Sequence, residues 1–324
     1  MDNKRVIVAM SGGVDSSVAA AILKNQGYDV VGIFMLMHKD SNSQDAKVVA
    51  KKLKINFKVL DVRKEFKKQV IDYTLKEHKL GNTPNPCVEC NKYIKFRFLL
   101  EKMVQLKADF VATGHYVRIK NKRLFIAKDA KKDQSYFLWT LKQEQLKRIL
   151  FPLSDYTKEQ VRGLAKKLKL PVFNKKESQD ICFTVPAEAL AKAGPGLILT
   201  TDNKKIGTHK GLTFYTIGQR KGIEISDAKP YYVVQKDFKK NALIVSQSEK
   251  DLLQKEMIVK NINFINGKSY SGKCKIKIRS TAKTADAMIK NNKIIFKKPQ
   301  RAITSGQSAV IYKGKEVLGG GVII

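Results

Sequence analysis

The sequence predicts an α/β protein in which a parallel-sheet domain is followed by a small central β module and a C-terminal β-barrel. Strand-like and helix-like segments alternate through the first half of the chain, the pattern of a parallel sheet covered by helices. A glycine-rich turn follows the first strand, at the edge where such sheets bind ligands. After the glycines and proline at 194–196 the segments become short and β-like, as in small sheets and barrels.

Hydrophobic spacing and turn residues set the expected bounds of each element. The strands of the parallel sheet are expected at 6–10, 30–35, 57–60 and 109–113. The helices are expected at 14–26, 46–54, 65–77, 92–106, 141–150 and 158–168. In the second half, β-strands are expected at 211–215, 231–234, 242–245, 273–279, 293–296 and 308–312.

Length and charge narrow the class of protein. A chain of 324 residues exceeds the usual single domain, so two or three domains are expected. The 63 Lys and Arg residues against 29 Asp and Glu residues leave a net charge of +34, which indicates either a polyanionic partner or a lysine-biased genome. Without a run of eighteen apolar residues or a signal-peptide pattern, we expect a soluble cytoplasmic protein with no membrane partner.

The turn Ser11-Gly12-Gly13-Val14-Asp15-Ser16 carries the clearest chemical signal. Adjacent glycines let the backbone bend tightly and approach a ligand closely. The helix that follows offers unpaired N–H groups and a positive dipole end, which together bind anions. The turn lacks the lysine of the common G-x-x-x-x-G-K-[ST] phosphate loop. It predicts a phosphate site of another kind, and the plain alternative is an ordinary glycine-rich turn.

Four cysteines in a cytosolic-looking chain favour chemistry or metal binding over a disulfide framework. Cys87 and Cys90 form a C-x-x-C pair in the rigid, polar loop 82–91. Cys90 precedes a predicted helix, whose dipole would lower the pKa of its thiol. Lysines shortly before Cys182 favour its thiolate. Cys274 lies in a β-pattern and is expected to be an ordinary strand residue.

Three further segments could bind ligands. His115 follows the strand at 109–113 and would face the same cleft as the phosphate turn, although a lone histidine is more often structural. Residues 132–137 and 216–222 mix cations with aromatic or polar residues, a composition typical of nucleic-acid contacts. Each of these two segments could equally be a solvated turn.

Together these motifs resemble the tRNA-specific 2-thiouridylases, PP-loop ATP pyrophosphatases of the HUP-like class that place sulfur on the wobble uridine of tRNA. The matching segments run nearly from end to end: AMSGGVDSSV, TPNPCVECNKYIKF, ATGHYV, KKDQSYFLW, SQDICF, FYTIGQRKG and SGQSAVIYKGKEVLGGG. The resemblance implies a PP-loop catalytic domain at 1–188, a central β-rich tRNA-binding module at 189–248 and a C-terminal β-barrel at 249–324.

The resemblance also implies a reaction. ATP, with Mg²⁺, would adenylate the 2-oxygen of uridine 34 in tRNAs of the Lys, Glu and Gln type. Cys182 would carry a persulfide received from a cysteine desulfurase or a sulfur carrier, and Cys90 would act as the nucleophile that releases the sulfur, leaving a transient disulfide. The products would be 2-thiouridine, AMP and pyrophosphate.

Individual positions follow from the matched motifs. The implied ATP-binding residues are Ala9, Met10, Ser11, Gly12, Gly13, Val14, Asp15, Ser16, Met35 and Gly114. The implied tRNA-binding residues are Asn85, Pro86, Cys87, His115, Lys132, Asp133, Gln134, Arg279, Ser280 and Gln307, of which the first three would meet the target base.

Two departures from the family pattern leave alternatives open. Many members carry an acid/base aspartate where this chain has Cys87, and a thiol matches that task less well near neutral pH. Cys87, Cys90 and Cys182 also resemble the set that holds an iron–sulfur cluster in related tRNA thiolation enzymes, so a cluster is the alternative to the persulfide. The segments after Met35 and Thr184 are shorter than usual, which predicts trimmed loops.

Two rival functions remain at this point. The first is a PP-loop ligase acting on a small metabolite, which would need neither the cysteines nor the charge. The second is a non-catalytic tRNA-binding protein, which would not need an intact phosphate turn.

Overall fold

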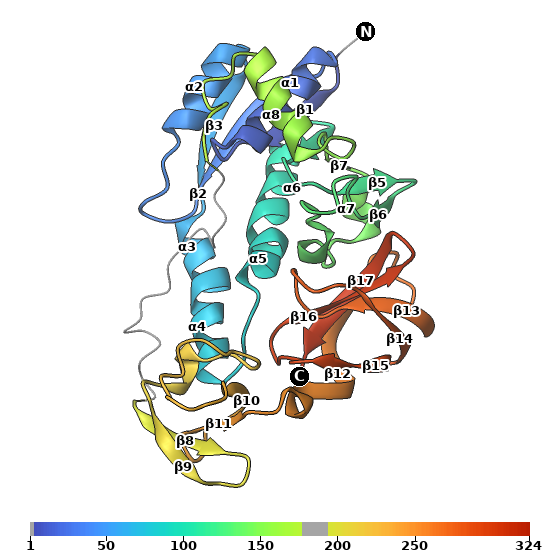
Figure 1. The fold of residues 1–324 in the computed structure, drawn as a ribbon. Helices are drawn as coiled ribbons and strands as arrows, with labels where there is room; N and C mark the ends of the chain where they lie inside the picture. The colour runs from blue at the N-terminus through green and yellow to red at the C-terminus, as the bar shows by residue number, and fades with distance from the viewer. Residues whose placement is uncertain (1–2, 177–193) are drawn as a thin grey trace.

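The computed structural model describes residues 3–176 and 194–324 (Figure 1). Cys182, the predicted persulfide carrier, lies outside the described residues. Within them, no helix is both long enough and apolar enough to cross a membrane.

A five-stranded parallel sheet forms the centre of the N-terminal domain, in the order β3-β2-β1-β4-β7. Its strands are β1 (Arg5–Ala9), β2 (Asp29–Leu36), β3 (Asn56–Asp61), β4 (Phe110–Ala112) and β7 (Ile149–Leu150). The run Val6-Ile7-Val8 in β1 has no exposed surface, as expected of a parallel strand covered on both faces. The predicted α/β class is therefore confirmed.

Helices cover both faces of this sheet (Figure 1). Val6 and Val8 pack in one core with α1 (Val14–Asn25), α2 (Gln44–Leu53) and α8 (Lys158–Lys167), whereas Ile7 belongs to a second core on the opposite face. Two long helical runs build that second face, each with a π-helical turn in the middle. They comprise α3 (Arg63–Phe66), η1 (Lys67–Ile71) and α4 (Asp72–Lys79), and α5 (Pro86–Glu89), η2 (Cys90–Lys95) and α6 (Phe96–Gln105).

Two of the predicted elements are wrong. The helix expected at 141–150 is only the short α7 (Gln143–Leu146), and β7 follows it because Ile149 pairs with Val111 at the sheet edge. The strand expected at 211–215 is instead a 3-10 turn, η4 (Leu212–Phe214). Short apolar runs are ambiguous between strand and helix until their neighbours are known.

The central module is a four-stranded sheet in the order β10-β11-β8-β9. Its strands are β8 (Gly196–Thr200), β9 (Lys205–His209), β10 (Tyr232–Asp237) and β11 (Ala242–Ser246). A small core that includes Ile198, Val233 and Leu243 holds the module together. The 3-10 turn η5 (Glu249–Leu252) leads from it into the last domain.

The C-terminal domain is a closed six-stranded antiparallel barrel, as predicted. Its strands run in the order β12-β15-β14-β13-β16-β17, and β12 pairs with β17 to close it. They are β12 (Leu253–Phe264), β13 (Gly272–Lys277), β14 (Ala285–Lys290), β15 (Lys293–Arg301), β16 (Ser308–Lys313) and β17 (Glu316–Ile323).

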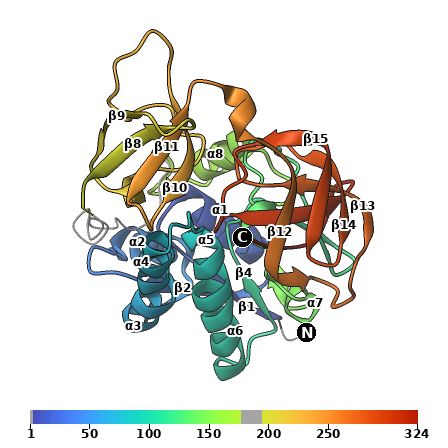
Figure 2. The same cartoon turned by 90° about the horizontal axis from the view of Figure 1, so that it is seen from below.

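The barrel is joined to the N-terminal domain by shared structure. The hairpin β5 (Arg118–Lys120) and β6 (Arg123–Phe125) extends the barrel sheet, because β6 pairs with β17. One hydrophobic core runs through both domains and contains Trp139 from the N-terminal domain and Tyr312 from the barrel. In Figure 2 the N-terminal end of the α5–α6 helix points to where the central module and the barrel meet.

Candidate active site

The phosphate turn lies between β1 and α1, where the sequence places it. Gly12 has φ +76°, and a Cβ there would lie 3.0 Å from the Cβ of Asp45 on α2, so glycine is required. The Ser16 hydroxyl donates to the carbonyl oxygen of Gly13 (3.1 Å) and accepts from the amide of Ser11 (3.2 Å). Among the residues that the structure describes, no side chain caps α1. The turn thus presents the uncapped, positive end of a helix, which suits phosphate.

Two other predicted ATP-binding residues lie at the ends of β2 and β4, the strands on either side of β1. Gly114 follows β4, and a Cβ there would lie 2.8 Å from the amide nitrogen of Ser16. Met35 lies near the end of β2 and is buried. The fold therefore brings the turn, Met35 and Gly114 to the same edge of the sheet, the carboxyl ends of adjacent parallel strands.

Asp15 of the turn is held by Tyr116, from the matched segment ATGHYV, and by Lys158, which no sequence motif indicates. Lys158, at the start of α8, approaches both carboxylate oxygens of Asp15 with its Nζ, at 2.7 and 2.8 Å. The hydroxyl of Tyr116 donates to the same carboxylate at 2.8 Å, and the Lys158 ammonium lies 5.8 Å from the centre of the Tyr116 ring. The carboxylate of Asp15 is consequently held by the ammonium of Lys158 and the hydroxyl of Tyr116.

The cysteine pair lies within a helix rather than ahead of one. Pro86 is the first residue of α5, so Cys87 occupies the first turn and Cys90 lies beyond it. The prediction that a helix dipole acts on Cys90 is therefore wrong, since the effect fades after the first turn and acts on Cys87 instead. A spacing of three residues places both thiols on one helix face, Cys87 half-buried and Cys90 buried.

The loop before this helix is clamped by the barrel. Thr83 donates its amide to the carbonyl of Ser305 (2.8 Å) and accepts a bond from Nε2 of Gln307 (2.9 Å). Gly306 has φ +91°, and a Cβ there would lie 2.9 Å from the Cβ of Asn82. Gln307, predicted from the sequence to contact tRNA, thus lies beside the segment predicted to meet the target base.

Asn85 of this loop bonds to Tyr136, which lies in the shared core. The Tyr136 hydroxyl donates to the carbonyl of Ser308 on β16 (2.9 Å), and Trp139 Nε1 donates to the Ser308 hydroxyl (3.0 Å). Burial raises the pKa of Tyr136 above its ordinary value. We call residues 82–87 the target-base loop, because the matched motifs predict that residues 85–87 meet the target base. This loop is therefore positioned by contacts between the N-terminal domain and the barrel.

His115 lies between the phosphate turn and the cysteine helix, the run α5–η2–α6 that carries Cys87 and Cys90. Its ring stacks on Phe96 with centroids 6.0 Å apart and meets Phe151 edge-on, while Nδ1 lies 2.7 Å from the Thr113 hydroxyl. Burial, helped by nearby Lys95, lowers the pKa of His115 to about 3. Burial therefore favours the neutral form of the imidazole at physiological pH.

The remaining predicted tRNA contacts form two groups. Asp133 accepts bonds from the Ala127 amide (2.9 Å) and the Ser135 hydroxyl (2.7 Å), and Gln134 accepts from the Tyr116 amide (3.0 Å). These side chains hold their own loop in shape. Lys132 belongs to this loop, whereas Arg279 and Ser280 follow β13 of the barrel.

The fold and the turn define a nucleotide-binding α/β protein with a HUP-type domain and two appended β domains. Family models agree: residues 4–186 match the tRNA methyl transferase HUP domain, 187–247 the tRNA methyl transferase PRC-barrel domain and 254–323 the Aminomethyltransferase beta-barrel domain. The tRNA-specific 2-thiouridylase MnmA of Clostridioides difficile is 42% identical over 355 residues, covering 99% of this chain and 98% of that protein.

A second relative, tRNA-specific 2-thiouridylase MnmA 2 of Thermoanaerobacter sp., is 44% identical over 99% of this chain and 98% of its own length. The protein of Clostridium acetobutylicum is 42% identical over 99% of both chains. The chain belongs to the tRNA-specific 2-thiouridylase family, which confirms the resemblance seen in its motifs.

Proposed function

We propose that this protein is an ATP-dependent tRNA-uridine 2-sulfurtransferase that converts the wobble uridine of tRNA to 2-thiouridine. The observation that carries the proposal is the segment 113–116, which joins the two halves of the site. Gly114 packs on Ser16 of the phosphate turn, and its neighbour His115 stacks on Phe96 of the cysteine helix. A nucleotide at the turn and a thiol on the helix would therefore act on the same bound base.

In the first step, the 2-oxygen of the uracil attacks the α-phosphorus of ATP and pyrophosphate leaves. The backbone of residues 9–16 and the start of α1 would bind the phosphates. Mg²⁺ would accompany ATP through its phosphate oxygens, because Asp15 is occupied by Lys158 and Tyr116. The base then carries AMP as a good leaving group at its C2 carbon.

In the second step, the terminal sulfur of a Cys182 persulfide bonds to C2 and AMP departs. The Cys90 thiolate then attacks Sγ of Cys182 and breaks the bond to the transferred sulfur. This leaves 2-thiouridine and a Cys90–Cys182 disulfide, which a cellular thiol must reduce before the next turnover. Cys87, in the first helical turn, would stand in the usual acid/base position.

The sulfur source and the RNA are part of the proposal. A cysteine desulfurase or a sulfur carrier would load Cys182, and tRNAs of the Lys, Glu and Gln type would be the substrates. The relatives' names, tRNA-specific 2-thiouridylases, support tRNA as the substrate class. The three-domain division at residues 188 and 248 likewise stays a prediction.

An iron–sulfur cluster is the second candidate for the sulfur-carrying group. Cys87 and Cys90 share a helix face and so could supply two ligands, with Cys182 as the third. Among the residues that the structure describes, no three metal-binding side chains gather at one place. Anaerobic purification decides between the candidates: an iron-free, colourless protein that still makes 2-thiouridine excludes the cluster.

Reconstitution with ATP, tRNA and a persulfide donor tests the function, with 2-thiouridine measured by nucleoside mass spectrometry. We expect Cys182→Ala and Cys90→Ala to form none. Cys274→Ala is the matched control, because this thiol is buried in β13 and burial raises its pKa to about 11. Product formed by Cys182→Ala would contradict the proposal.

The rival ligase function is tested in the same assay. A thiouridylase forms AMP and pyrophosphate in response to tRNA, so tRNA should stimulate ATP turnover. Turnover that a small metabolite stimulates and tRNA does not would favour the ligase.

A further inference from the structure

Lys175 lies against the phosphate turn, and no step of the proposed reaction uses it. Its Nζ donates to the carbonyl oxygen of Gly12 (3.4 Å) and forms an ion pair with Asp45 on α2 (2.5 Å). Gly12 and Asp45 are themselves in close contact, because a Cβ at Gly12 would lie 3.0 Å from the Cβ of Asp45. A residue 163 positions away along the chain thus places an ammonium group beside the glycines of the turn.

Two lysines thus bond to the turn, and their surroundings differ. Lys158 bonds to both carboxylate oxygens of Asp15, and its side chain is 12% exposed. The side chain of Lys175 is 45% exposed, and its second bond goes to a backbone carbonyl rather than to the other oxygen of Asp45. An exposed ion pair is weak, so a more highly charged anion can replace its carboxylate. Of the two cations, Lys175 is therefore the one that is available to a ligand.

The turn itself contains no cation for the phosphates that leave. Residues 11–16 lack the lysine with which the common phosphate loop reaches the β- and γ-phosphates. Cleavage of ATP between the α- and β-phosphates moves the electron pair of the broken P–O bond onto pyrophosphate. Negative charge therefore grows on the leaving group, and a cation placed there stabilises the transition state.

We propose that Lys175 binds the β- and γ-phosphates of ATP and stabilises pyrophosphate as it leaves. When the nucleotide binds, the ammonium would exchange the Asp45 carboxylate and the Gly12 carbonyl for phosphate oxygens. The uracil 2-oxygen then bonds to the α-phosphorus, and the bond from that phosphorus to the bridging oxygen breaks. Lys175 faces the pyrophosphate that takes the electron pair, and Asp45 receives the ammonium again once pyrophosphate has left.

The first test measures the Kd values of magnesium pyrophosphate and of AMP by isothermal titration calorimetry, without tRNA. We expect Lys175→Ala to raise the Kd of pyrophosphate about tenfold and to leave the Kd of AMP unchanged, because Lys175 would contact only the phosphates that leave. Lys175→Arg keeps the charge and the donors, so its Kd for pyrophosphate should stay within about threefold of the wild-type value. This inference rests on the proposed function only for the identity of the attacking oxygen.

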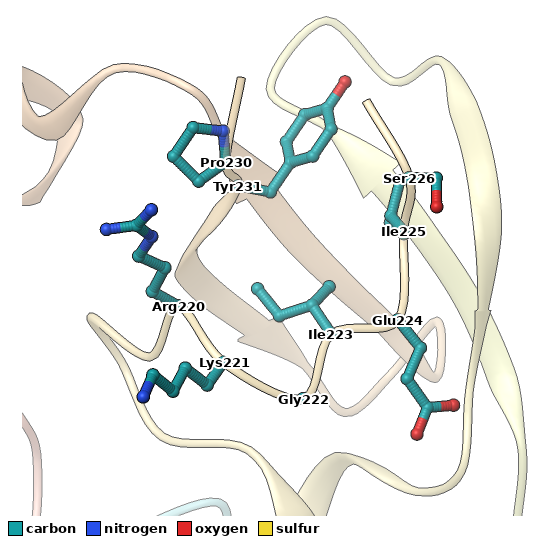
Figure 3. Close-up of a pocket in the computed structure, with 9 residues that line it drawn as sticks. All are labelled: Arg220, Lys221, Gly222, Ile223, Glu224, Ile225, Ser226, Pro230 and Tyr231. Carbon is teal, nitrogen blue, oxygen red and sulfur yellow. The ribbon is translucent and has the colours of Figure 1, made fainter. Parts of the chain in front are cut away.

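Lys210→Ala is the matched control. Lys210 also forms an exposed ion pair, with Glu224 (2.7 Å), but at the open cavity of about 650 Å³ in the central module (Figure 3). Alanine there removes the same charge and breaks the same kind of pair, so the Kd of pyrophosphate should change less than about twofold. A difference between the two alanine variants therefore reports the place of Lys175 and not its charge alone.

Asp45→Asn tests whether the ion pair only supports the shape of the turn. The substitution keeps the size of the side chain that packs on Gly12 but removes the carboxylate that holds the ammonium. If Lys175 binds phosphate, loss of the competing carboxylate should lower the Kd of pyrophosphate about threefold. If the pair only supports the turn, Asp45→Asn and Lys175→Ala should both raise that Kd, and this result would overturn the inference.

The second test measures kcat for tRNA-dependent pyrophosphate release. We expect Lys175→Ala to lower it about 100-fold, because the charge on the leaving group loses its cation. Wild-type pyrophosphate affinity or an unchanged kcat in Lys175→Ala overturns the inference. An equal loss of AMP affinity also overturns it, because the turn would then be misshapen. If the wild-type protein makes no 2-thiouridine but the difference in pyrophosphate binding holds, only the proposed function fails.

Discussion

The phosphate turn and the target-base loop are built in opposite ways. The turn is made by consecutive residues, and its hydrogen bonds join Ser11, Gly13 and Ser16. The loop at 82–87 is held from the barrel, through a bond between Thr83 and Gln307, which lie 224 positions apart. The backbone of the turn is thus shaped by bonds among neighbouring residues, with distant segments packed against it at Asp15 and Ser16, whereas the shape of the loop itself depends on the contacts between the two domains.

The first prediction breaks the link between the two regions, and we expect the largest effect from it. In Gly114→Ala the new Cβ would press on backbone atoms of Asp15 and Ser16, which cannot move aside. We expect tRNA-dependent ATP turnover to fall on the order of 100-fold and the free energy of unfolding to fall by about 2–3 kcal/mol. Pyrophosphate release and urea unfolding measure the two effects.

The matched control for this change is Gly163→Ala. Gly163 lies inside α8 with open space around its missing Cβ. Alanine there should raise the free energy of unfolding by about 0.5–1 kcal/mol and leave turnover unchanged. Equal effects of the two alanines would show that Gly114 is not needed for close packing.

The second prediction disturbs only the target-base loop. Gly306→Ala would push its Cβ against Asn82 and Thr83 and so shift the target-base loop. We expect thiolation to fall about tenfold, with ATP affinity unchanged because the atoms that a Cβ at Gly306 would meet belong to Asn82 and Thr83 and not to the phosphate turn. Gly267→Ala has a similar positive φ but open space, so it reports the backbone strain without the collision. A loss of ATP affinity in Gly306→Ala would contradict the independence of the two regions.

The third prediction uses the histidine that lies between the regions. Because the pKa of His115 falls to about 3 in the folded protein, only the unfolded chain gains a proton as pH drops below about 6.5. Stability is therefore full above that pH and declines as pH falls toward 3. Between pH 7 and pH 5 this loss should be about 2 kcal/mol.

Urea unfolding at both pH values, in wild type and in His115→Phe, measures the effect. The variant should lose less stability than wild type on acidification. His78 and His209, whose pKa values burial also lowers, add the same background to both proteins. Identical losses in the two proteins would mean that His115 is protonated in the folded state.

The fourth prediction tests a hydrogen bond at the phosphate turn, and we expect the smallest effect from it. Tyr116→Phe removes the hydroxyl that donates to Asp15, and should lower the free energy of unfolding by about 1–2 kcal/mol. Tyr28→Phe is the control, because within the described residues the Tyr28 ring packs on Phe110 and its hydroxyl makes no hydrogen bond. A cost no larger than that of the control would show that the phenol does not hold Asp15.

Several strands and turns could be predicted because the residues that specify them are neighbours in the sequence. The strands around Ile7 and Ile33 are apolar and β-branched, and glycines mark the turn that follows the first of them. The strands β12, β14 and β17 were missed, as were β8 and β9. Part of β17 consists of three glycines, which carry no strand propensity but let the strand cross close to Trp139 and Asn263.

The residues of the candidate site also fall into two groups, those that sequence motifs indicate and those that only the folded structure brings to the site. Matched motifs predicted the turn, the cysteines and Gln307, but nothing near Asp15 in the sequence indicated Lys158, which is 143 positions away. The expectation for Cys90 failed because the helix begins at Pro86, and proline at the first helical position is as compatible with a loop as with a helix.

The sequence by itself determined the chemistry: a helix start that binds phosphate, and cysteines that fit sulfur transfer. The first follows from residue type and short spacing, and the second from motifs that resemble the tRNA-specific 2-thiouridylases. Only the tertiary structure decided where the chemistry acts. The barrel clamp on Thr83 and the link through Gly114 and His115 are contacts between distant segments. Such contacts follow from packing across a shared core, which no local pattern encodes.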